Sequence, residues 1–97
     1  MKLLGITKSD KPGKKLKATF EEETTGRKRT THFGAAGMDD YTKTHDKEQR
    51  KRYRTRHKKD LATGDPTKAG FLSYYVLWGD STSLEANIAA YKRRFQL

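Results

Sequence analysis

The sequence contains no cysteine and is poor in proline and in apolar residues. None of the 97 residues is cysteine, two are proline, and only 32% are apolar. The lack of cysteine excludes disulfides, thiolate zinc sites, iron–sulfur clusters and cysteine nucleophiles. An average domain is roughly 45–50% apolar. We therefore expect one small domain over residues 1–97, without the large core that surrounds a deep enzyme pocket.

Long hydrophobic runs are also missing. The apolar run from Leu3 to Ile6 is far shorter than the roughly 7–15 residues of a signal-peptide core. No stretch approaches the roughly 20 apolar residues of a membrane span. We expect a soluble, intracellular protein that is neither secreted nor membrane-spanning.

Motifs for catalysis and metal binding are absent as well. The three histidines, His32, His45 and His57, do not have the i, i+4 spacing of a helical zinc site. No phosphate-binding glycine loop of the Walker type, serine-nucleophile motif or carboxylate pair stands out. Gly34 and Gly37 have G-x-x-G spacing, but Asp39 and Asp40 follow and would repel a phosphate. We expect no enzymatic activity, no cofactor, no metal and no small-molecule substrate.

Positive charge is abundant, and it is concentrated in one segment. The chain carries 22 basic and 12 acidic residues, a formal charge of +10, of which residues 41–60 hold +6. Residues 46–60 read DKEQRKRYRTRHKKD, and their long side chains favour a helix. Acidic residues at its start and lysines at its end suit the helix dipole. The sequence therefore predicts a basic helix over residues 46–60.

The predicted basic helix has two kinds of face. Lys47, Lys51, Arg54 and Lys58 fall on one face of a helical wheel, and this face is entirely cationic. Tyr53 and His57 share another face, the only partly apolar one. We expect the helix to contact the domain through Tyr53 and to leave its other side chains in solvent.

Residues 2–33 have the alternation of β-strands. Leu4 and Ile6 alternate with Thr7 and Lys8, and residues 15–20 repeat the same period of two. Pro12-Gly13 and Gly26 mark the turns between three strands. The pattern predicts a three-stranded antiparallel β-meander, which needs a helical cover to be stable.

The cover is expected from residues 69–95. Leu84, Ile88, Tyr91 and Phe95 form one helical stripe over residues 83–95, preceded by a Thr82–Glu85 capping box. Residues 69–78 are apolar nearly all round, so they fit either a buried strand or a short buried helix. We favour the helix, because Pro66 suits its start and Gly79 suits the C′ position after its end. The predicted fold class is α+β, a small three-stranded meander followed by about three helices.

The aromatic cluster Tyr74, Tyr75 and Trp78 has two interpretations. Such rings can stack on exposed bases. Because the chain has so little other apolar material, we expect these three residues to belong to the core.

Concentrated positive charge suggests binding to phosphates. Each Lys or Arg that neutralises a phosphate releases counterions, which drives binding without reading base sequence. We expect a nucleic-acid partner, DNA in the first instance. The alternatives are docking to an acidic protein surface and a solvated helix that only maintains solubility. The predicted contact residues are Lys47, Arg50, Lys51, Arg54, Arg56, Lys58 and Lys59 on the helix and Arg27, Lys28 and Arg29 on the sheet.

Three blocks of the sequence resemble a known family. They are HFGAAGMDDYTKTHD at 32–46, RKRYRTRHKKDL at 50–61 and KAGFLSYYVLWGDSTSLEANI at 68–88. These blocks are similar to small uncharacterised basic proteins encoded by large DNA viruses of algae and protists, a domain of unknown function. The resemblance implies a viral origin, and with it a location inside the host cell or within the virion, but it transfers no functional residue. It supports an alternative role as a minor capsid or core protein that binds acidic surfaces of other virion proteins.

Overall fold

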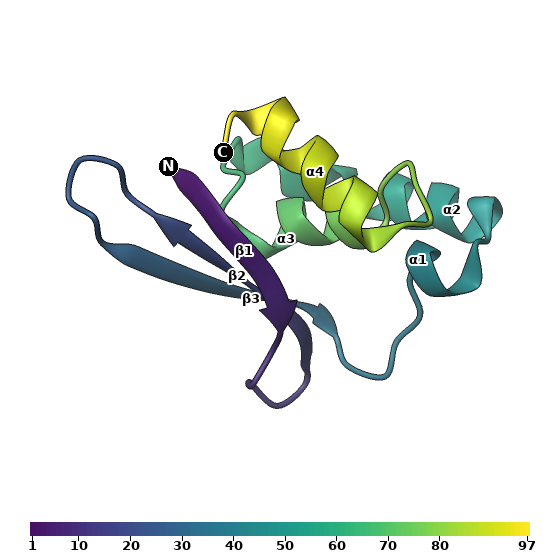
Figure 1. Ribbon diagram of the computed structural model, residues 1–97. Coiled ribbons are helices and arrows are strands. Elements are labelled where there is room, and N and C mark those ends of the chain that lie inside the picture. The colour runs from purple at the N-terminus through teal and green to yellow at the C-terminus, as the bar shows by residue number, and fades with distance from the viewer.

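The computed structural model describes residues 1–97 and shows a sheet followed by helices (Figure 1). The strands pair antiparallel in the order β1-β2-β3. The predicted α+β fold, a three-stranded meander followed by helices, is confirmed. The elements are β1 (Lys2–Lys8), β2 (Lys14–Glu21), β3 (Lys28–Ala35), α1 (Tyr41–Thr44), α2 (Lys47–His57), the 3-10 helix η1 (Lys58–Thr63), α3 (Ala69–Leu72), the π-helical η2 (Ser73–Leu77) and α4 (Leu84–Phe95).

One face of the sheet forms one side of the core. Ala18, Phe20 and Phe33 are fully buried, and α3 with η2 packs against β3. Leu4 and Ile6, which regular alternation would place on one face of the sheet, do not share a face. A register shift between Leu3 and Gly5 inserts an extra residue, so Leu3 and Ile6 face the core and Leu4 is 42% exposed.

Residues 69–77 form a helix rather than a strand. They begin as α3 and widen into η2, in which the backbone N–H of Trp78 donates to Ser73 O, five residues back, at 3.0 Å. Leu72, Val76 and Leu77 are buried against the sheet and α4.

Of the three aromatic residues expected in the core, Trp78 is buried and Tyr75 packs against the core. The prediction is wrong for Tyr74, which is half-buried and lies outside the core.

Gly79 ends this helical stretch for a reason other than the predicted one. It does not adopt the left-handed conformation of a C′ glycine. Instead it is buried, and a Cβ atom there would lie 2.2 Å from Tyr75 O and 2.7 Å from the side chain of Asn87. Close approach of the backbone, rather than a positive φ, therefore requires glycine.

The C-terminal helix follows its predicted stripe. Tyr91 is buried, and Leu84, Ile88 and Phe95 pack against the core. The predicted cap is displaced by one residue. Ser83, not Thr82, is the N-cap, and its hydroxyl accepts a hydrogen bond from the N–H of Ala86.

The single helix predicted over 46–60 is divided between α2 and the 3-10 helix η1. The chain leaves α2 at His57 and continues directly into η1, and the short helix α1 precedes α2.

Asp40 caps α1. Its side chain accepts a hydrogen bond from the N–H of Thr42 and forms a 2.7 Å ion pair with Lys15 of β2. Burial alone would raise the pKa of Asp40, but hydrogen bonds from Lys15 and Thr42 hold it below its ordinary value. No helix has the length and apolar character that crossing a bilayer demands.

Candidate functional site

The inner side of α2 is anchored by stacked aromatic rings. Tyr53 stacks on Trp78 with ring centroids 4.4 Å apart and on His57 at 4.2 Å. Burial raises the pKa of the Tyr53 hydroxyl above its ordinary value. The predicted contact through Tyr53 is confirmed.

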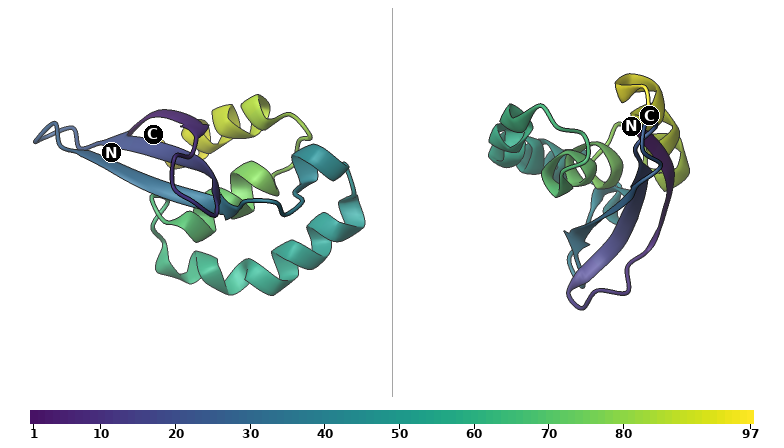
Figure 2. Two further views of the ribbon diagram at one scale, coloured as in Figure 1. Left: turned by 90° about the horizontal axis from the view of Figure 1, so that it is seen from below. Right: turned by 90° about the vertical axis from the view of Figure 1, so that its left-hand side faces the viewer.

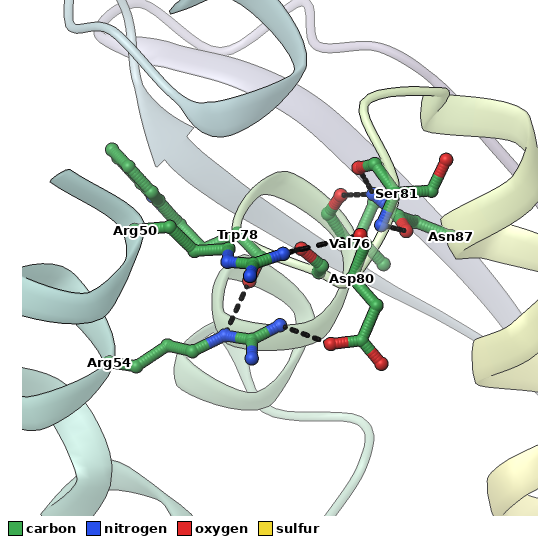
Figure 3. Close-up of polar contacts among 8 residues, drawn as sticks. Arg50, Arg54, Val76, Trp78, Asp80, Ser81 and Asn87 are labelled. Carbon is green, nitrogen blue, oxygen red and sulfur yellow. Dashed lines mark hydrogen bonds and ion pairs between the residues drawn. The ribbon is translucent and has the colours of Figure 1, made fainter. Parts of the chain in front are cut away.

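Two arginines also face inward, so the expectation that α2 leaves its other side chains in solvent is wrong. Arg54 Nε donates to Trp78 O at 2.8 Å, and its Nη2 pairs with the Asp80 carboxylate at 2.9 Å. Arg50 Nη1 donates to Gly79 O and Asp80 O at 3.3 and 3.2 Å. Figure 3 shows both guanidinium groups directed from α2 towards this segment.

The attraction between these arginines and residues 78–80 has a simple cause. The last carbonyl groups of a helical stretch have no partner within it and carry partial negative charge. Arg54 donates to the carbonyl of Trp78, the C-cap of η2, and Arg50 donates to the two carbonyls that follow Trp78. The hydrogen bond from Arg54 holds the pKa of Asp80 below its ordinary value, and the charges of Arg50 and Arg94 act in the same direction.

The same segment is held from the other side by α4. The buried Asn87 amide donates to Val76 O at 3.0 Å and to Ser81 O at 2.8 Å, and it accepts from the N–H of Ser81. Residues 76–81 are therefore fixed between α2 and α4 (Figure 3). Sequence reasoning missed Asn87. One feature of the sequence indicated this role: Asn87 stands three residues after Leu84 and four before Tyr91, which places its amide on the inner face of α4.

The outer side of α2 and η1 is a surface of free cations. These side chains are exposed, and none of them has a carboxylate within ion-pair distance. The only acidic residue among 47–59 is Glu48. Arg52 belongs to this surface although it was not among the predicted residues. The exposed cations are Lys47, Lys51, Arg52, Arg56, Lys58 and Lys59.

Part of this surface is a groove of about 410 Å³, called the lysine groove below. The four residues predicted to share a face, Lys47, Lys51, Arg54 and Lys58, all line it. Five cations and one carboxylate face the groove, so its potential is positive. Its lining residues are Lys47, Glu48, Arg50, Lys51, Arg54, Thr55, Lys58 and Tyr74.

The second predicted cluster lies elsewhere. Arg27, Lys28 and Arg29 are exposed at the β2–β3 hairpin and the start of β3. The hairpin projects from the end of the molecule opposite α1, as the two orientations in Figures 1 and 2 show. The structure therefore does not join this cluster to the lysine groove.

Comparison with known proteins gives one match. A family described as "Family of unknown function (DUF5754)" matches residues 4–57, just over half of the chain. The matched part runs from β1 through α2 and thus includes most of the exposed cations. No curated protein and no solved structure matches the chain.

Proposed function

We propose that this chain, which belongs to the DUF5754 family of unknown function, is a non-enzymatic protein that binds nucleic acid through phosphates. The observation that supports it is the set of six exposed, unpaired cations between Lys47 and Lys59. A cation already paired with a carboxylate would gain little from a phosphate. These six are available, and the contact they make is independent of base sequence.

The lysine groove is the centre of the proposed contact. Lys47, Lys51 and Lys58 lie along it over about 16 Å of helix. Arg50 and Arg54 add positive potential from the groove wall, but their hydrogen bonds to residues 78–80 limit them to a supporting part. We expect the direct phosphate contacts from the lysines.

Salt dependence tests the proposal. A labelled random duplex of about 20 base pairs is titrated between about 50 and 200 mM NaCl. Three to six contacts predict that log K falls with log salt with a slope of about −3 to −5. Lys51→Ala and Lys58→Ala should each flatten the slope by about one. Lys8→Ala removes an exposed cation of β1 and should leave the slope unchanged. Salt-insensitive binding, or none at the lower salt, contradicts the proposal.

The proposal includes a viral origin and a location in the infected cell or the virion. It is supported by the resemblance of blocks 32–46, 50–61 and 68–88 to proteins of large DNA viruses. The same cations would also attract carboxylates, so a minor capsid or core role is the second candidate. Purified particles treated with nuclease separate the two: release supports nucleic-acid binding, and retention supports docking on acidic virion proteins.

A further inference from the structure

A second hollow lies beside the lysine groove and has a different lining. It encloses about 380 Å³ between η2, residues 79–80 and α4, and is called the tyrosine hollow below. Tyr74 and Tyr75 line it together with Asp80, Arg54 and Arg94. Arg54 and Tyr74 line both spaces, so the hollow and the groove adjoin.

Tyr74 is not explained by packing. Tyr75 contacts the rings of Phe71, Tyr91 and Phe95 and packs against the core, whereas Tyr74 has only Tyr75 as a ring neighbour, at 5.0 Å. Tyr74 also lies outside the set of side chains that pack on the core. It is held in the wide π-helical turn of η2, a type of turn that is frequent at functional sites.

The lining of the hollow favours a flat, uncharged group over a phosphate. The guanidinium of Arg94 lies 4.9 Å from the Tyr75 ring centroid, and that of Arg54 lies 5.7 Å from the Tyr74 ring centroid. Tyrosine rings and guanidinium planes are surfaces on which nucleobases stack. Two cations and one carboxylate line the hollow, against five cations and one carboxylate in the lysine groove, so a phosphate is better placed in the groove.

The walls of the hollow are fixed before any ligand arrives. Residues 79–80 receive hydrogen bonds from Arg50 and Arg54, and Asn87 holds the flanking residues Val76 and Ser81. A site that is already ordered loses less conformational entropy on binding.

We propose that the tyrosine hollow receives an unpaired nucleobase while the adjoining phosphates lie in the lysine groove, so that single-stranded nucleic acid is bound more tightly than a duplex, which makes the phosphate contacts alone. This inference rests on the proposed function and narrows it. A base within a duplex is paired and stacked, so it cannot reach Tyr74 without being extruded.

The test compares three labelled probes of equal length at one salt concentration: a thymine single strand, a duplex, and a strand of abasic residues. The wild type should bind the thymine strand roughly tenfold or more tightly than the abasic strand. It should also bind the thymine strand more tightly than the duplex, whose paired bases cannot enter the hollow. Tyr74→Leu should remove the preference for the thymine strand over the abasic strand, and Tyr74→Phe should keep it. Because Tyr74 lies outside the core, both variants should fold, which thermal melting by circular dichroism checks.

A matched pair on α4 controls for charge. Arg93→Ala and Arg94→Ala remove the same charge, but only Arg94 lines the hollow. Only Arg94→Ala should reduce the preference for the thymine strand over the abasic strand. Equal wild-type affinity for these two strands, with steep salt dependence, overturns the base site and leaves phosphate binding standing. Failure to bind any probe at low salt overturns both proposals.

Discussion

The backbone at Gly79 leaves no room for a side chain, which makes a sharp stability prediction. A Cβ atom there would overlap Tyr75 O at 2.2 Å and the Asn87 side chain at 2.7 Å, and neither group can move freely. Gly79→Ala should therefore lower the free energy of unfolding by about 3 kcal/mol or more. Urea denaturation measures the change. Gly5→Ala is the control, since a Cβ atom at Gly5 meets nothing within 4 Å; equal stability of the two variants would contradict the packing described.

The ion pair of Asp40 with Lys15 predicts a dependence of stability on pH. The folded pKa of Asp40 lies below its ordinary value of 3.8, since the hydrogen bonds outweigh the effect of burial. A lowered pKa means that the stabilisation is complete above the unfolded pKa and is lost as pH falls through the folded value. Asp40→Asn, which leaves Lys15 unpaired, should cost about 3 kcal/mol at neutral pH.

The difference between wild type and Asp40→Asn should then shrink as pH falls below about 4. Urea denaturation of both proteins between about pH 2.5 and 7 measures it. Asp39→Asn, a change at the exposed neighbour that forms no ion pair, should keep wild-type stability throughout. A difference that stays constant with pH would show that the carboxylate charge of Asp40 does not stabilise the fold.

At the scale of elements, α2 combines a structural side and a binding side. Arg54 faces the carbonyl of Trp78, whereas Lys51 faces solvent. Arg54→Ala should lower the free energy of unfolding by about 1–3 kcal/mol, because it removes a charge-assisted hydrogen bond. Lys51→Ala should change stability by less than about 0.5 kcal/mol, and its main effect should be a lower affinity for nucleic acid. Parallel urea denaturation and salt titration distinguish the two roles; equal stability losses would contradict them.

Elements with a clear local period could be predicted from the sequence. The alternation at residues 15–20 and the stripe from Leu84 to Phe95 depend on neighbouring residues alone. Arg50 and Arg54 could not be placed, because the carbonyls they contact lie 24 to 30 residues further along the chain. The exposure of Leu4 was missed for a related reason, since a β-bulge shows only once the strands are paired.

At the scale of the whole molecule, the positive charge is divided between two places. The molecule is 42 Å long, and the hairpin with Arg27 and Lys28 lies at the end opposite α1 (Figure 2). The exposed cations of α2 and η1 occupy the helical side. Binding that depends on total charge can therefore be distinguished from binding that depends on where the cations lie.

Two variants of equal charge separate these effects. Replacing a cation by Gln lowers the formal charge by one, so Arg27→Gln/Lys28→Gln and Lys47→Gln/Lys51→Gln both carry +8 in place of +10. If placement decides, the helix variant should flatten the salt slope for duplex binding by about two and the hairpin variant should leave it unchanged. If net charge decides, both variants should lose affinity equally, because long-range attraction depends on the total. The structure favours the first result, since Lys47 and Lys51 share one groove with Lys58 and the hairpin residues do not line it.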